Sequence, residues 1–132
     1  MKVLVDSDAL FAAYSAVDPN HERAVSQFRL LRFQGVTCYV INLVLYEVVT
    51  VISHKLGQDV AVGFVKNLPT LNLNRIDFDA VMEEKSWKVF MNQTKKGTSF
   101  ADCANVAVMR EMNLDQIFSF DKFYKRVGLE MV

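Results

Sequence analysis

The chain alternates between short, strongly apolar runs and longer stretches in which apolar residues recur at helical spacing. The short runs predict β-strands, and the longer stretches predict helices with one apolar face. We expect strands at 3–5, 37–41, 71–76 and 117–120, and an edge strand at 128–132. We expect helices at 19–35, 42–56, 59–67, 79–91 and 99–112, and a turn or one helical turn at 122–126. Strands that alternate with helices favour an α/β sandwich with a mainly parallel sheet.

Polar residues mark where several of these helices begin. The pair 18–19 is Asp-Pro, which is typical of a helix start with Asp as N-cap and Pro in the first turn. Either Asp77 or Asp79 would cap the helix that follows. Ser99 and Asp102 have the spacing of a capping box at the start of the next helix.

Length and composition describe an ordinary globular chain. Its 132 residues match one domain spanning 1–132, with 52% hydrophobic and 23% charged residues. The 15 basic side chains balance 15 acidic ones, which argues against a protein that coats duplex nucleic acid through bulk charge. A local basic strip beside an acidic pocket is compatible with this balance.

Cysteine usage and the apolar runs bear on the cellular compartment. Cys38 and Cys103 are too few for a disulfide framework, and neither has zinc-type spacing with a histidine. This favours a reducing, cytoplasmic setting. The N-terminal residues lack the regions of a signal peptide, and charged residues interrupt every apolar run, so we expect no membrane association.

Acidic residues stand at the ends of two predicted strands. Asp6 follows the first strand, Asp121 follows the fourth, and Asp8 lies in the turn after Asp6. In open parallel sheets, ligands bind at the carboxyl ends of the strands. We therefore expect these carboxylates to lie on the functional edge of the sheet.

Two further acids lie in predicted helices. Glu47 interrupts the stretch 43–52, which is apolar nearly all round and is therefore expected to be largely buried. A buried carboxylate is costly unless it is paired, so Glu47 must meet a partner from another element or face a cleft. Asp102 lies near the start of its helix, where the helix dipole favours an anion.

Each acid also has an ordinary structural explanation. Asp6 and Asp121 equally fit helix caps, Asp8 fits a cap better than a ligand, and Glu47 can pair with an arginine in the core. Carboxylates that converge repel each other by up to about 4 kcal/mol per close pair at an effective dielectric of about 20. A hard divalent cation relieves that repulsion, and Mg²⁺ or Mn²⁺ prefers oxygen ligands. Acids without His or Cys ligands therefore favour metal-assisted phosphodiester chemistry over zinc hydrolysis.

Four blocks of the sequence, in order, resemble the PIN-domain ribonucleases, and among them the VapC toxins of toxin–antitoxin pairs. Each block carries one acid: 3–10 with Asp6, 42–48 with Glu47, 98–104 with Asp102 and 118–124 with Asp121. The resemblance covers the whole chain. It departs from the family at Asp8, where Asn or Ser is common, and Ser119 stands where Thr is also common.

The resemblance implies a PIN-like three-layer α/β/α sandwich and a metal-dependent endoribonuclease, the toxin of a toxin–antitoxin pair. It implies that four acids are catalytic and hold one or two Mg²⁺ or Mn²⁺ ions, namely Asp6, Glu47, Asp102 and Asp121. Ser7, Asp8, Ser99 and Ser119 are candidates for supporting the ligands or a phosphate, although each serine equally fits a cap or turn. The resemblance also implies an RNA substrate, a homodimer and a groove for a cognate antitoxin.

Two basic clusters flank the third and fourth acids and are candidates for holding an RNA backbone, although paired loop lysines are often only solvated. They consist of Lys95, Lys96, Lys122, Lys125 and Arg126.

Two alternatives remain at this point. One is a catalytically silent PIN scaffold or RNA-binding module, which the presence of all four acids does not support. The other is a receiver-like signalling domain, which also gathers acids at strand ends. That fold needs an Asp at the end of its middle strand, whereas 71–76 ends in Arg75-Ile76 before Asp77, and it gives Glu47 no role.

Overall fold

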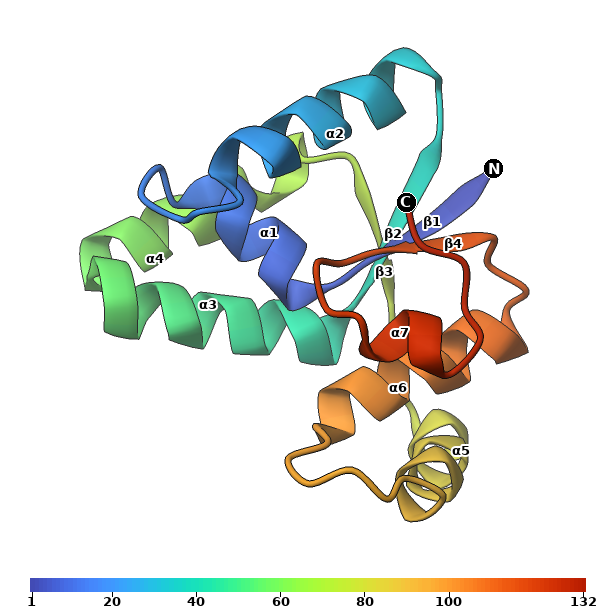
Figure 1. The fold of residues 1–132 in the computed structure, drawn as a ribbon. Coiled ribbons are helices and arrows are strands. Elements are labelled where there is room, and N and C mark those ends of the chain that lie inside the picture. The colour runs from blue at the N-terminus through green and yellow to red at the C-terminus, as the bar shows by residue number, and fades with distance from the viewer.

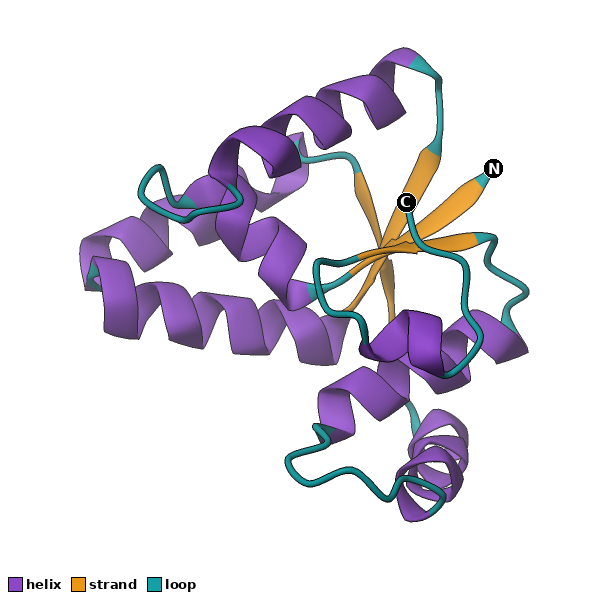
Figure 2. Ribbon diagram, in the orientation of Figure 1, coloured by secondary structure: helices purple, strands orange, loops and turns teal.

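The computed structural model describes residues 1–132 and is built around a four-stranded, entirely parallel sheet (Figures 1 and 2). The strands are β1 (Lys2–Val5), β2 (Thr37–Ile41), β3 (Leu73–Ile76) and β4 (Gln116–Phe118), in the order β3-β2-β1-β4. Val3, Leu4 and Val5 are fully buried. A central strand of a parallel sheet is covered on both faces, which explains why this run is continuously apolar.

Helices cover both faces of the sheet, so the predicted three-layer α/β/α sandwich is confirmed (Figure 1). One group consists of α1 (Ser7–Tyr14), α2 (His21–Phe33), α3 (Asn42–Leu56) and α4 (Gln58–Asn67), followed by a short 3₁₀ turn at Leu68–Thr70. The other group consists of α5 (Ala80–Met91), α6 (Phe100–Glu111) and α7 (Phe123–Arg126). None of these helices combines the length and the hydropathy that a membrane-spanning helix needs.

The starts of two helices differ from the sequence prediction. Helix α2 begins at His21, after Asn20, because the Asp18 carboxylate accepts a hydrogen bond from the Asn20 backbone N–H at 2.8 Å and closes a turn there. Ser99 is the N-cap residue of α6, but its side chain makes no capping hydrogen bond. The predicted capping box with Asp102 is therefore wrong, since the Asp102 carboxylate is bonded elsewhere.

The C-terminal end of the sheet is shorter than predicted. β4 ends at Phe118 instead of Phe120, and 128–132 forms a single parallel bridge between Ile117 and Met131 in place of an edge strand. The backbone N–H groups of Gly128 and Leu129 donate to carbonyl groups of α7, so this stretch closes the helix. Only the residues after it are left to pair with β4.

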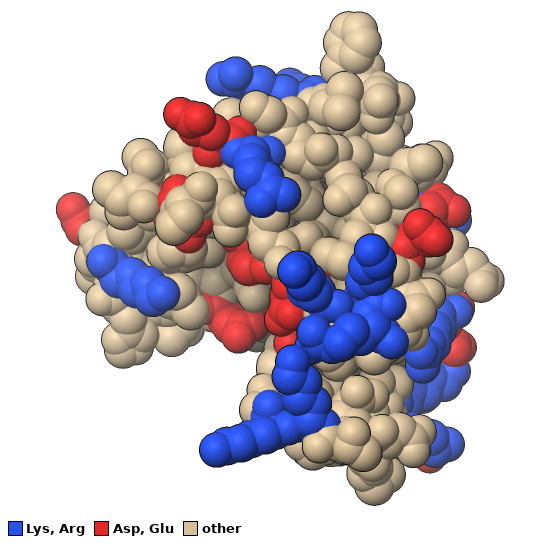
Figure 3. All heavy atoms as spheres, in the orientation of Figure 1, with Lys and Arg blue, Asp and Glu red and all other residues tan.

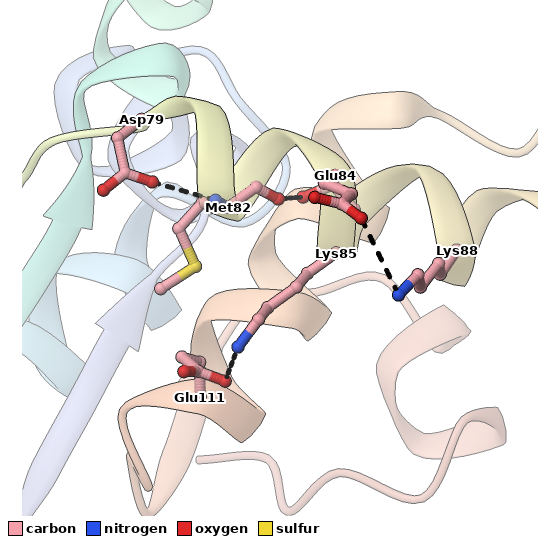
Figure 4. A network of polar contacts seen from close by, with 7 residues as sticks. Asp79, Met82, Glu84, Lys85, Lys88 and Glu111 are labelled. Atoms are coloured by element: carbon pink, nitrogen blue, oxygen red, sulfur yellow. Dashed lines mark hydrogen bonds and ion pairs between the residues drawn. The ribbon is translucent and has the colours of Figure 1, made fainter.

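Helix α5 packs mainly against α6 at one end of the molecule (Figures 1 and 4). Asp79, rather than Asp77, caps α5, accepting from the Met82 N–H at 2.8 Å. An ion pair between Lys85 and Glu111 joins the two helices (Figure 4). Trp87 on the same helix is 45% exposed, so α5 presents apolar surface to its surroundings.

Candidate active site

The candidate site begins where β1 and β4 end side by side. The chain leaves β1 toward β2 on one side, while β4 lies on the other, so the strand order reverses at this point. The register pairs Val5 with Phe118, and the Asp6 backbone N–H still donates to the Phe118 carbonyl at 3.0 Å. Asp6 and Ser119 are therefore neighbours at the carboxyl edge, at the kind of switch point where parallel sheets bind ligands.

Asp6 is the buried centre of the cluster, with 3% of its surface exposed. Its Oδ1 accepts hydrogen bonds from the Ser7 N–H at 2.8 Å and from Asn105 Nδ2 at 2.9 Å. Its Oδ2 accepts from Ser119 Oγ and from the Tyr124 hydroxyl, both at 2.9 Å. Burial nevertheless raises the pKa of Asp6, and these four donors offset only part of that cost. Asp6 also caps α1 by accepting from the Ser7 N–H. Asp6 is therefore both a helix cap and a member of the acidic cluster.

Asp102 faces Asp6 across the Tyr124 hydroxyl. Tyr124 lies 3.0 Å from Asp102 Oδ1 and also receives a hydrogen bond from Asn105 Nδ2 at 3.0 Å. A phenol has one proton, so it donates to one of the two carboxylates at a time. Burial, followed by the negative charge of Asp6, raises the pKa of Asp102 to about 7. The pKa of Tyr124 is also raised, chiefly by burial, so the phenol stays neutral.

Asp8 ties the first helix to the turn after β4. Its carboxylate accepts from the Phe120 N–H at 2.9 Å and lies 3.1 Å from Ser119 Oγ. Burial and the charge of Asp6 raise its pKa to about 6. Asp8 is therefore not the helix cap that the sequence favoured; it joins Asp6 through the Ser119 hydroxyl.

Glu47 lies at the rim of the site. Its side chain is exposed and lines a cavity of about 260 Å³ together with Ser7 and Asp8. The expectation that its helix is buried nearly all round is wrong, because only one side of α3, with Leu45, Val48 and Ile52, is fully packed in the core. Glu47 has no arginine partner; it faces this cavity, and Ser7 of α1 is its hydrogen-bond partner there. Partial burial and the charge of Asp6 raise its pKa, and a hydrogen bond from Ser7 opposes that rise.

Asp121 is exposed in the turn that leads to α7. Its Oδ1 accepts from the Phe123 N–H at 2.9 Å, and its own N–H donates to Ser119 Oγ at 3.0 Å. Its charge is nevertheless close enough to raise the pKa of Asp102. The charges of Asp6, Glu47 and Asp121 all act on Asp102, so the structure gathers the four predicted acids into one electrostatic cluster.

Asn105 and Tyr124 also hold this cluster together, and neither is predicted as a site residue from the sequence. Asn105 is fully buried in a run of small and apolar residues, three positions after Asp102 and thus on the same helix face. A polar amide among apolar residues of a buried helix face is the feature of the sequence that could have indicated its role. Tyr124 has no such feature, because a tyrosine in a short amphipathic segment is ordinary core.

The remaining candidates lie around the cluster. Ser99 is half-buried at the start of α6 and makes no side-chain hydrogen bond. The five basic candidates are all exposed and unpaired: Lys95, Lys96, Lys122, Lys125 and Arg126. Figure 3 shows Lys and Arg side chains gathered over α7 and the loop before α6, next to acidic side chains.

The cluster fits a divalent cation by its donor chemistry. All of its candidate ligating atoms are oxygens, and burial, followed by the negative charge of Asp6, raises the pKa values of Asp8, Glu47 and Asp102. As placed, no three of the carboxylates converge closely enough to hold a metal ion. Both oxygens of Asp6 are occupied by protein donors, so a cation would have to replace at least one of these hydrogen bonds.

Comparisons with known proteins agree with this architecture. The fold matches VapC20 of Mycobacterium tuberculosis, a toxin that cleaves the sarcin–ricin loop, with a TM-score of 0.83 and 23% identity over 96% of this chain and 95% of that one. It also matches VapBC2 of Rickettsia felis bound to promoter DNA (TM-score 0.77, 16% identity, 100% and 98% coverage). A third match is FitAcB of Neisseria gonorrhoeae (TM-score 0.69, 16% identity, 98% and 95% coverage).

At these identities the structural matches show the fold alone. No curated protein sequence matches the chain significantly. The model of the PIN domain family, however, matches residues 3–129. That span takes in all four blocks that suggested the family, and it leaves no support for a receiver-like domain. The chain belongs to the PIN domain family.

Proposed function

We propose that the protein is an endoribonuclease that hydrolyses RNA phosphodiester bonds with the help of Mg²⁺ or Mn²⁺. The observation that carries the proposal is the buried Asp6 carboxylate at the switch point of the sheet, with Asp102 across one phenol from it. Carboxylates that lie this close together without a basic partner repel each other, and a bound cation relieves that repulsion. PIN-domain membership and the VapC fold support nuclease chemistry in general.

The proposed ligands are Asp6, Glu47, Asp102 and Asp121. A bound divalent cation would supply an activated water and would stabilise the negative charge that builds on the phosphate. Asn105, Ser119 and Tyr124 fix the orientation of Asp6. Asp102 Oδ1 is engaged by Tyr124 and Oδ2 makes no hydrogen bond in the protein, so Oδ2 is the oxygen that would hold the cation.

We further propose that the protein is the cytoplasmic toxin of a toxin–antitoxin pair and forms a homodimer. The support is the fold, since VapBC2 and a toxin–antitoxin complex of Klebsiella pneumoniae are among its matches. An apolar cavity of about 500 Å³ between α1, α2 and α4, lined by Leu10, Phe28 and Phe64, suits an antitoxin segment. The exposed apolar residues of α5, Trp87 and Met91 among them, suit a second copy.

The first test of the nuclease proposal is cleavage of a mixed single-stranded RNA pool with Mg²⁺, with Mn²⁺ and with EDTA. We expect cleavage with either ion and none in EDTA. Isothermal titration with each ion gives an independent readout of the site. Binding of neither ion, together with no cleavage, would instead establish the silent scaffold.

The basic cluster gives a separate prediction on RNA affinity. Replacing Lys122 and Lys125 by Gln should weaken binding and reduce the slope of log K against log salt by about 1.4, because each contact with single-stranded RNA releases about 0.7 of a counterion. Filter binding over a salt series measures this slope. Gln at Lys66 and Lys88, two exposed lysines outside the cluster, is the charge-matched control. Equal slopes for the two double variants would show that the cluster is only solvated.

A further inference from the structure

A second hollow opens directly beside the acidic cluster. Its volume is about 490 Å³, and it lies between α2 and the turn after β4. Ser119 and Phe120 line it. The same two residues bind the acids, since Ser119 Oγ donates to Asp6 and the Phe120 N–H donates to Asp8 at 2.9 Å. A ligand bound in this hollow would therefore contact residues that are themselves hydrogen-bonded to the candidate catalytic carboxylates.

The inner wall of the hollow is a fixed aromatic ring. Phe120 packs edge-to-face on the buried Phe118, with ring centroids 5.8 Å apart. Phe118 in turn packs on Phe28 of α2 at 4.8 Å. Because its backbone N–H is bound to Asp8, Phe120 is positioned from both its main chain and its side chain. A ring held this way loses little freedom when a ligand stacks on it.

The outer wall carries a cation without an ionic partner. The guanidinium of Arg23 lies over the Phe120 ring, with Cζ 5.1 Å from the ring centroid. Arg23 is exposed, forms no ion pair, and its guanidinium makes one hydrogen bond, a long one of 3.4 Å to Asn20 Oδ1. The side chain is thus free to lift from the ring and to close over a flat ligand, which both partners can stack against.

The rim of the hollow adds hydrogen-bonding groups. Glu22, Ser26 and Gln27 lie on α2 next to Arg23 and line the same space. An aromatic face, a guanidinium, an amide and a carboxylate are together the groups that recognise a nucleobase in single-stranded RNA. A protein partner fits this hollow less well than the cavity between α1, α2 and α4, which has about the same volume but a more apolar lining.

We propose that this hollow is a nucleobase subsite, in which Phe120 and Arg23 clamp the base of the RNA nucleotide next to the cleaved bond. The proposal rests on the nuclease function proposed above. It divides the substrate between two surfaces. The two basic clusters, in the loop before α6 and at α7, hold phosphates. None of their five residues lines the hollow. Phe120 and Arg23 hold a base and thereby favour unpaired RNA.

The test uses short homopolymeric RNA oligonucleotides of each base, each carrying one 2-aminopurine, in EDTA so that they are not cut. Stacking quenches 2-aminopurine fluorescence, and anisotropy gives the affinity. We expect Phe120→Leu to abolish the quenching and weaken binding about tenfold, and Arg23→Gln to weaken it about threefold. Phe120→Tyr, which keeps the aromatic face, should retain both the quenching and the affinity of the wild type. In Mg²⁺, the losses should appear in KM, with kcat little changed.

Two matched controls lie on α2 outside the hollow. Phe33→Leu removes a ring that is 90% exposed, and Arg29→Gln removes an exposed guanidinium. Both controls should bind and quench as the wild type does. Arg23→Gln also guards against a folding artefact, because its exposed side chain contributes little to the core.

The outcomes separate this proposal from the nuclease function. If the wild type cuts no RNA but quenching is lost only in Phe120→Leu, the subsite stands and the nuclease proposal falls. If metal-dependent cleavage is present while Phe120→Leu quenches and binds like the wild type, the subsite is wrong and the nuclease proposal stands. Absence of quenching in the wild type also overturns the subsite.

Discussion

The Asp6→Asn protein should lose RNA cleavage by about a thousandfold or more while keeping its fold. Asp6 is the most buried of the acids, and after burial its charge is the next cause of the raised pKa values of Asp8, Glu47 and Asp102. Removing that charge lowers the affinity of the cluster for a cation. It also places an amide N–H₂ group among hydroxyls that now donate to the carboxylate.

Initial rates on the mixed RNA pool, with thermal unfolding as the check on folding, measure this effect. Asp102→Asn should be as inactive, since it removes the carboxylate on the other side of Tyr124. Asp59→Asn, an exposed carboxylate on α4, should cleave like the wild type and serves as the matched control. Cleavage that survives both site substitutions would point to a contaminating nuclease, and full activity in Asp6→Asn alone would place the centre elsewhere.

A site residue can be predicted from the sequence when the pattern that marks it lies within a few residues of it in the chain. Asp6 was found because β1 ends at Val5, so the rule on strand ends applies directly. Asp121 was found by the same rule, although β4 ends three residues earlier and the acid lies in the turn. In both cases a feature within a few residues of the chain carries the information.

Asn105 and Tyr124 could not be assigned in the same way. Tyr124 meets Asp6 across 118 positions of sequence, and Asn105 meets it across 99. Only the packing of α6 and α7 beside β1 brings them together, and no local pattern encodes that packing. The capping box failed for the same reason, because the long-range hydrogen bond from Tyr124 engages the Asp102 carboxylate instead.

Glu47 shows the opposite error. The run around it is so apolar that burial on every side was expected, yet Tyr46 is 58% exposed and Glu47 faces solvent beside the acids. An apolar residue on the surface costs little and is common, whereas a carboxylate in the core is costly. The polar residue was therefore the better guide to the orientation of this helix.

The stability of the metal-free protein should fall as the pH rises from about 4 to about 8. The pKa of Asp8 is about 6 and that of Asp102 about 7, against the usual value of 3.8. A carboxyl group whose pKa is higher in the folded than in the unfolded chain binds protons more tightly when folded. The stabilisation that such a group adds to the folded state is complete below pH 3.8. It is lost as the pH rises through about 6 for Asp8 and about 7 for Asp102. We expect a loss on the order of 2 kcal/mol, after allowing for solvent screening.

Urea unfolding in EDTA at a series of pH values measures this dependence. Asp102→Asn removes one of the titrating groups, so its profile should be flatter between pH 6 and 8, whereas Asp59→Asn should follow the wild type. A stability that rises over this range would contradict the proton linkage. Added Mg²⁺ or Mn²⁺ should restore stability, and more so at higher pH, because a cation binds the carboxylates only after their protons have left. A stabilisation by Mg²⁺ that is the same at pH 5 and pH 8, or that persists in Asp6→Asn, would mean that the ion binds outside the acidic cluster.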